Sequence, residues 1–92
     1  MIQKLLLISG KVQNVGFRHW LYMKVTKKNI RGWVKNNTTG KVEVLLIGDD
    51  DEVNDIIKQC KKGPDASNVT QVEIWDYQQK YIKKSFDILN AS

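Results

Sequence analysis

The chain has 92 residues, of which 41% are hydrophobic, so it can build one domain with a single core and is too short for two. It has one cysteine and one histidine, which exclude an internal disulfide and give no cluster with metal-ligand spacing. Fifteen Lys and Arg against ten Asp and Glu give a net charge of +5, which suits an anionic partner, either a small phosphate compound or a nucleic acid. We expect a single domain over residues 1–92, with no cofactor and no metal.

The N-terminal third is predicted to form a strand and then a helix. An apolar run over 4–9 is typical of a central strand, which Gly10 ends. Apolar residues recur at three- to four-residue spacing over 17–25, and the cations and asparagine at 27–29 are typical of a helix end.

A hairpin and a second helix are predicted next. Strands over 31–36 and 41–47 flank the turn residues 37–40. The acidic cluster at 49–52 favours a helix N-terminus, and 61–64, which contains Gly and Pro, ends that helix. One apolar stripe marks its buried face: Val53, Ile56, Ile57 and Cys60.

Strands over 69–77 and 85–89 complete the prediction. The order strand, helix, strand, strand, helix, strand indicates an α+β, ferredoxin-like split βαβ sandwich. In it, two helices cover one face of a four- or five-stranded, mainly antiparallel sheet. The first two strands must run parallel because a helix crosses between them, so 10–18 should meet Lys35 and Asn36 at one edge.

The junction between the first strand and the first helix has the composition of an anion-binding loop. Residues 10–18 read Gly-Lys-Val-Gln-Asn-Val-Gly-Phe-Arg, with two glycines and an arginine at the helix start. Glycines let backbone amides turn inward, the first helical amides are unpaired, and the helix dipole adds positive charge. Arg18 can add a bidentate grip on phosphate oxygens.

Two segments in order resemble the signatures of a known family, the acylphosphatases. Residues 10–18 are similar to the first signature, and 32–36, Gly-Trp-Val-Lys-Asn, are similar to the second. The resemblance extends to 40–44, to 63–64 and to 86–88, so it covers nearly the whole chain.

The resemblance implies an enzyme that hydrolyses acyl phosphates to a carboxylate and inorganic phosphate. It implies that Arg18 binds the phosphoryl group and that Asn36 holds the attacking water. Loop amides would complete the phosphate site, from these residues: Gln13, Asn14, Val15, Gly16, Phe17 and Arg18. Such chemistry needs positioning and charge neutralisation rather than a nucleophilic side chain, because the acyl phosphate has a good leaving group.

Asn14 departs from the family pattern, which has glycine at this place. If the position needs the left-handed region, asparagine is the next most tolerated residue, and activity survives. If it needs a region open only to glycine, the loop distorts and phosphate binding weakens. We predict an active enzyme, slowed in the second case.

The order of elements and the loop composition are also compatible with two other functions. An RNA-binding RRM domain shares the order of elements, but the matching strand over 41–47 lacks the aromatic residues that stack bases, so no nucleic acid partner is expected. The second alternative is a binding-only relative, which keeps the phosphate site but has lost turnover because of Asn14. The presence of Arg18 and Asn36 argues against this alternative. His19 is not expected to act directly, because successive helix positions point in different directions.

The first eight residues are mostly apolar, but the run is too short to span a membrane and lacks the small-residue cleavage site of a signal peptide. We expect a cytoplasmic protein that does not contact membranes. Nothing in the sequence indicates more than a monomer, and a small-molecule acyl phosphate and inorganic phosphate are the expected partners.

Overall fold

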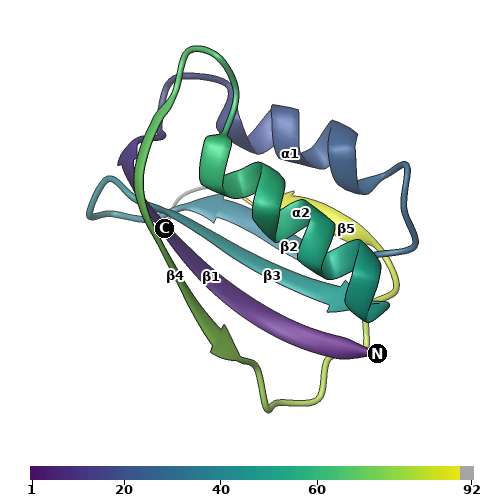
Figure 1. Cartoon of the computed structure of the whole chain (residues 1–92). Coiled ribbons are helices and arrows are strands. Elements are labelled where there is room, and N and C mark those ends of the chain that lie inside the picture. The colour runs from purple at the N-terminus through teal and green to yellow at the C-terminus, as the bar shows by residue number, and fades with distance from the viewer. Residues whose placement is uncertain (90–92) are drawn as a thin grey trace.

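Five strands and two helices follow one another along residues 1–89, the part of the chain that the computed structural model describes (Figure 1). In chain order they are β1 (Ile2–Lys11), α1 (Phe17–Val25), β2 (Arg31–Asn36), β3 (Val42–Gly48), α2 (Asp50–Lys62), β4 (Asn68–Asp76) and β5 (Phe86–Leu89). Each predicted element is present, with ends shifted by at most two residues. Neither helix is both long and apolar enough to cross a bilayer.

The strands form one sheet in the order β4-β1-β3-β2-β5. β1 and β2 each pair antiparallel with β3, so they run parallel to each other, as the crossover helix between them requires. β1 pairs antiparallel with β4, and the short β5 pairs parallel with β2. Both helices lie on the same face of the sheet, which confirms the predicted ferredoxin-like α+β fold (Figure 1).

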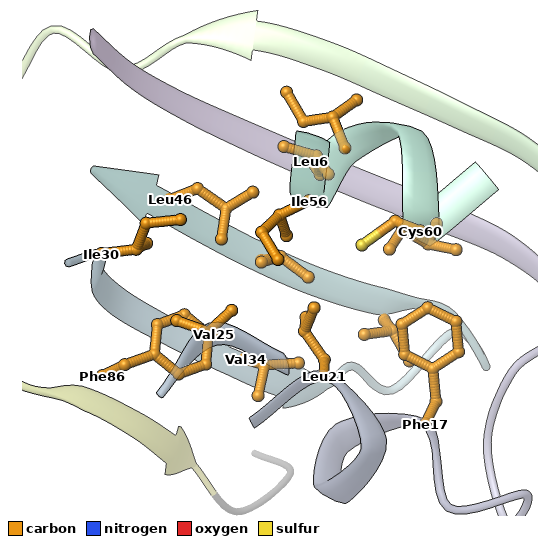
Figure 2. Close-up of a cluster of buried hydrophobic side chains, with 14 of the residues drawn as sticks. Leu6, Phe17, Leu21, Val25, Ile30, Val34, Leu46, Ile56, Cys60 and Phe86 are labelled. Atoms are coloured by element: carbon orange, nitrogen blue, oxygen red, sulfur yellow. The ribbon is translucent and has the colours of Figure 1, made fainter. Parts of the chain in front are cut away.

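The core lies between this face and the two helices and is built from apolar side chains (Figure 2). The stripe predicted on α2 is fully buried or nearly so, and α1 presents its own apolar stripe beside it. The labelled members in Figure 2 come from both helices, from four strands and from the residue just before β2: Leu6, Phe17, Leu21, Val25, Ile30, Val34, Leu46, Ile56, Cys60 and Phe86. The core therefore fixes where α1, and the loop before it, sit over the sheet.

The prediction that Gly10 ends the first strand is wrong by one residue, because the strand continues to Lys11 through an irregularity. The register of β1 against β4 shifts between Ser9 and Gly10, which is the mark of a β-bulge. Gly10 has a φ of 119°, and a Cβ on it would lie 2.1 Å from the carbonyl oxygen of Asn68. The absence of a side chain thus lets the two strands approach closely just before the loop that joins β1 to α1.

A segment over 77–85 joins β4 to β5 at opposite edges of the sheet. Gln3 on β1 donates from Nε2 to the carbonyl oxygens of Tyr77 and Gln79, at 2.8 and 3.0 Å. Arg31 on β2 donates from Nη1 to the carbonyl oxygens of Tyr81 and Lys83, at 2.6 and 2.9 Å. Two side chains of the sheet therefore fasten this long connection at the end opposite the loop.

Candidate active site

The loop after β1 and the end of β2 meet around a depression of about 330 Å³. Its lining comes from the loop, the first turn of α1, β2 and β5: Val12, Asn14, Gly16, Phe17, Arg18, His19, Asn36 and Ile88. Five of the residues predicted for the site thus lie around one hollow, although 18 positions separate Arg18 from Asn36 in the sequence. The juxtaposition follows from the parallel arrangement of β1 and β2.

The loop is anchored at both ends by buried side chains. Val12 is 1% exposed and Phe17 is 2% exposed, and both belong to the core. Between them Asn14 has a φ of 61°, and it is the only residue other than glycine among residues 1–89 with a positive φ. Val15 packs its side chain against the core, so it does not line the hollow. Anchors on either side hold the loop backbone in place while its middle stays exposed.

The start of α1 faces the hollow with unpaired amides. Gly16 is the residue before the helix and carries no side chain that caps it. The first intrahelical bond runs from the Trp20 amide to the Gly16 carbonyl oxygen, at 2.9 Å, so the amides of residues 17–19 have no partner within the helix. The first turn contains no acidic residue, and nothing there offsets the positive end of the helix dipole.

Arg18 brings a full positive charge to the same place. Its side chain is half-buried, and Nη1 donates to the carbonyl oxygen of Leu89 on β5, at 3.1 Å. None of the ion pairs formed among residues 1–89 involves Arg18. A guanidinium has five N–H donors, so this contact orients the group while leaving most of its donors for an anion.

Asn36 lies at the last paired position of β2, opposite Val42 of β3. Side chains alternate along a strand, and Val34, two residues earlier, is buried in the core under α1. Asn36 therefore points to the helix side of the sheet, toward the loop. Its primary amide can accept a hydrogen bond from water through Oδ1 and donate one through Nδ2.

Lys35 takes the opposite direction, so the prediction that it would join this edge is wrong for its side chain. Its Nζ lies 5.2 Å from the centre of the Trp33 ring, on the sheet face away from the helices. The alternation of β2 explains the difference, because neighbours on a strand face opposite sides. The basic character of the hollow comes from Arg18 and the helix start.

The loop after α2 packs against Phe17, the first residue of α1. The Phe17 ring lies against Gly63, where a Cβ would come 3.2 Å from Cε2 of the ring. Trp20 meets the same phenyl ring edge-on, with the ring centres 5.3 Å apart. Gly63 thus leaves room for the aromatic side chain that fixes the beginning of α1.

Three features of the site were missed by the sequence reasoning. Ile88 lines the hollow and the Leu89 carbonyl orients Arg18, because β5 lies beside β2 in a parallel register. Local patterns carry no signal for such a long-range pairing. The third feature is the side chain of Gln13, which turns away from the hollow and donates to two backbone carbonyls of the turn after β2.

Taken together, the geometry suits a small oxyanion rather than a metal ion. Backbone amides, a helix start and a guanidinium all present hydrogen-bond donors to one hollow, and an amide side chain lies at its rim. No group of three or more His, Cys, Asp and Glu side chains that could hold a metal occurs among residues 1–89.

Known proteins of the same kind are found by sequence and by structure. The family model described as Acylphosphatase matches residues 4–88. Acylphosphatases of Acidiphilium cryptum and Rhodopseudomonas palustris are 39% and 36% identical to this chain, over 78% and 92% of it and 79% and 91% of their own lengths. The crystal structure of acylphosphatase from Bacillus subtilis superposes with a TM-score of 0.90 at 31% identity, covering 97% of this chain and 99% of that one.

The structure defines a small α+β, ferredoxin-like domain in which the loop before the first helix lines a hollow beside Arg18 and Asn36. That fold alone hosts many functions, so the matches in sequence carry the next step. The chain belongs to the acylphosphatase family, and with it to the hydrolases.

Proposed function

We propose that this protein hydrolyses the carboxyl-phosphate anhydride of acyl phosphates, giving a carboxylate and inorganic phosphate. Membership of the family supports the substrate class. The observation that carries the mechanism is the placement of Arg18 and Asn36 around one hollow with the loop and the start of α1. In the proposed mechanism, the phosphoryl group occupies the hollow and the acyl group extends toward solvent.

Phosphoryl binding is assigned to Arg18 and to the backbone amides of residues 13–18. The amides and the helix dipole act on the equatorial oxygens, whose charge is largest as the bond to the leaving group breaks. The bond from Arg18 to the Leu89 carbonyl holds the guanidinium in place before substrate arrives. Preorganised donors of this kind favour the transition state because they need no reorganisation during the reaction.

Water attack is assigned to Asn36. Its Oδ1 accepts a hydrogen bond from the water, which aims a lone pair of the water oxygen at phosphorus, in line with the departing carboxylate. A new bond forms between the water oxygen and phosphorus, the anhydride bond from phosphorus to oxygen breaks, and the carboxylate leaves with the electron pair. The protons of the water end on the phosphate and in solvent, so no strong base is required of the protein.

The proposed function also indicates the partners and the location of the protein. We propose a monomer as the active form. The hollow is small enough for a phosphoryl group and part of its substituent, which supports a small-molecule substrate rather than a nucleic acid or a membrane. We propose that the enzyme acts in the cytoplasm, where acyl phosphates are formed.

Hydrolysis of benzoyl phosphate in the presence of EDTA tests the function. Wild type should turn over, Arg18→Ala should lose about 10³-fold or more in kcat/KM, and Asn36→Ala should lose about 10²-fold or more. Lys61→Ala and Asn54→Ala remove the same kinds of group at exposed positions of α2 and should leave the rate unchanged.

Each outcome has a definite meaning. Turnover by wild type with EDTA present, and its loss in the two site variants alone, establishes the proposed roles. A correctly folded wild type that binds inorganic phosphate but does not hydrolyse benzoyl phosphate would identify a binding-only relative. Equal loss in the control variants would show that the assay reports folding rather than the site.

A further inference from the structure

Gln13 begins the predicted phosphate-binding stretch, yet its side chain reaches across to the turn that follows β2. Its Nε2 donates to the carbonyl oxygen of Asn37 at 2.8 Å and to that of Lys41 at 2.9 Å. The side chain is half-buried, and both hydrogens of its amide group are used in these two bonds. The side chain thus joins the loop to a separate segment of the chain.

The turn that Gln13 contacts is closed by its own hydrogen bonds. Oδ1 of Asn37 accepts from the amide and the hydroxyl of Thr39, at 3.0 and 2.8 Å, and from the amide of Lys41, at 2.9 Å. The amide of Asn37 donates to the Lys41 carbonyl oxygen, at 2.9 Å. Gln13 therefore binds both ends of a closed turn, so its two hydrogen bonds hold the whole turn in place relative to the loop.

Asn36 is the residue immediately before this turn. Its pairing with Val42 is the last of the β2–β3 register, so the peptide after Asn36 is set by the turn. A displacement of the turn relative to the loop would therefore move Asn36 relative to a phosphoryl group held by the loop amides and Arg18. Gln13 is the only side chain among residues 1–89 that forms a hydrogen bond between the segments 12–16 and 37–41.

We propose that Gln13 is a positioning residue, whose carboxamide sets the distance between the phosphate-binding loop and Asn36. The proposal rests on the function proposed above, since it assigns Gln13 to the alignment of water with the bound phosphoryl group. A displacement of about 1 Å between reacting groups lowers a rate by about 10²-fold, so the alignment matters even where binding survives. The side chain acts through Asn36 and does not touch the substrate.

This role predicts a separation of kcat from phosphate binding. In Gln13→Met the side chain keeps nearly the same length and loses both donors, while Arg18 and the loop amides remain. We expect kcat for benzoyl phosphate to fall about tenfold or more, and the Ki of inorganic phosphate to stay within about threefold of wild type. Gln78→Met makes the same exchange at an exposed position of the connection after β4 and should change neither quantity.

A second variant approaches the same contact from the turn. Asn37→Ala removes the acceptor that closes the turn and should lower kcat with the Ki of phosphate retained, whereas Asn37→Asp keeps the acceptor and should retain activity. Gln13→Met removes the donor and Asn37→Ala loosens the turn that carries the acceptors. Because both act on the link between the loop and the turn, the double variant should cost less in kcat than the product of the two separate losses. A kcat within about twofold of wild type in folded Gln13→Met, or a Ki that rises as much as kcat falls, overturns the proposal.

A measurement that needs no turnover separates this proposal from the proposed function. In ¹⁵N-labelled wild type, titration with inorganic phosphate should shift the amide signals of residues 14–16 and, with the same midpoint, the side-chain amide of Asn36. In Gln13→Met the loop signals should still shift and the Asn36 signal should not. A wild type without hydrolysis would overturn the proposed function, whereas a phosphate response at Asn36 that is equal in both proteins would overturn the role of Gln13.

Discussion

Asn14 stands where the family pattern has glycine, and its backbone shows which of the two expectations applies. Its φ of 61° is close to the left-handed value of about 57°. Asparagine enters this region more readily than other residues with a side chain, since its short polar group can bond locally. The side chain lies at the exposed middle of the loop, so no neighbour has to move for it. The loop therefore carries little of the strain that a glycine-only conformation would impose.

Replacement of Asn14 tests this directly. Asn14→Gly should change the free energy of unfolding by less than about 1 kcal/mol and kcat/KM by less than about threefold. Asn14→Val, with a β-branched side chain in the left-handed region, should lose about 2 kcal/mol and weaken phosphate binding as the loop departs from this shape. Urea unfolding and benzoyl phosphate kinetics measure both quantities. A rise in turnover of about tenfold in Asn14→Gly would show that the loop is strained after all.

Among the elements, the contact of β1 with β4 at Gly10 fixes where the loop starts. A Cβ there would lie 2.1 Å from the Asn68 carbonyl oxygen and 2.8 Å from the Thr70 amide nitrogen, and both atoms belong to backbone that cannot rotate away. The end of β1 can hold its place only if one strand approaches the other this closely. The bulge between Ser9 and Gly10 belongs to the same arrangement.

We predict that Gly10→Ala loses about 3 kcal/mol or more in unfolding free energy and weakens phosphate binding, since β1 must move away from β4. Gly40→Ala is the matched control. Gly40 also has a positive φ, of 87°, but nothing lies within 4 Å of an added Cβ, so the cost should be about 1 kcal/mol. Urea unfolding and phosphate titration measure the pair. Equal losses would mean that the backbone angle alone, and not the contact with Asn68, makes glycine necessary.

At this scale the sequence predicted most of the architecture. Hydrophobic spacing gave both helices, and β2 was predicted with the bounds that the structure has. The parallel relation of the first two strands predicted that Asn36 lies beside the loop. The assignment of the fold and the juxtaposition of Arg18 with Asn36 therefore depended on local patterns and one rule of topology.

The features that the sequence did not predict depend on contacts between residues far apart in the chain. The parallel pairing of β5 with β2 brings Ile88 to the site. A strand of four residues is too short for its sequence pattern to indicate which strand it pairs with. The bonds of Gln13 join residues 24 and 28 positions apart. Arg31 fastens the connection after β4 through two backbone carbonyls 50 and 52 positions away in the sequence. Single side chains acting on distant backbone give no periodic signal, so only the folded chain shows them.

For the whole molecule, a buried thiol in the core makes stability depend on pH at alkaline values. Cys60 is fully buried, and no charged residue among 1–89 is buried with it. Desolvation by burial raises the pKa of the Cys60 thiol from 9.0 to about 12. Above pH 9.0 the unfolded thiol loses its proton while the folded one keeps it, so unfolding releases a proton and stability falls as pH rises toward about 12.

The expected effect can be measured against a variant that lacks the thiol. Between about pH 8 and about pH 10, wild type should lose about 1.4 kcal/mol more unfolding free energy than Cys60→Ala, since the other titrating groups are common to both. Urea unfolding with a reducing agent present gives both values. Parallel losses in the two proteins would show that the thiol does not remain protonated in the folded state at alkaline pH.

The central place of β1 in the sheet also affects how the chain folds during its synthesis. β1 leaves the ribosome before the other strands of the sheet, whereas its neighbour β4 follows only after β2, β3 and α2. At about 5–20 residues per second, the nascent chain keeps one edge of β1 without a partner for a few seconds after β3 has emerged. During this interval Leu5 and Leu7 lack their β4 neighbours Trp75 and Glu73, and the unpaired backbone of β1 can pair with another chain.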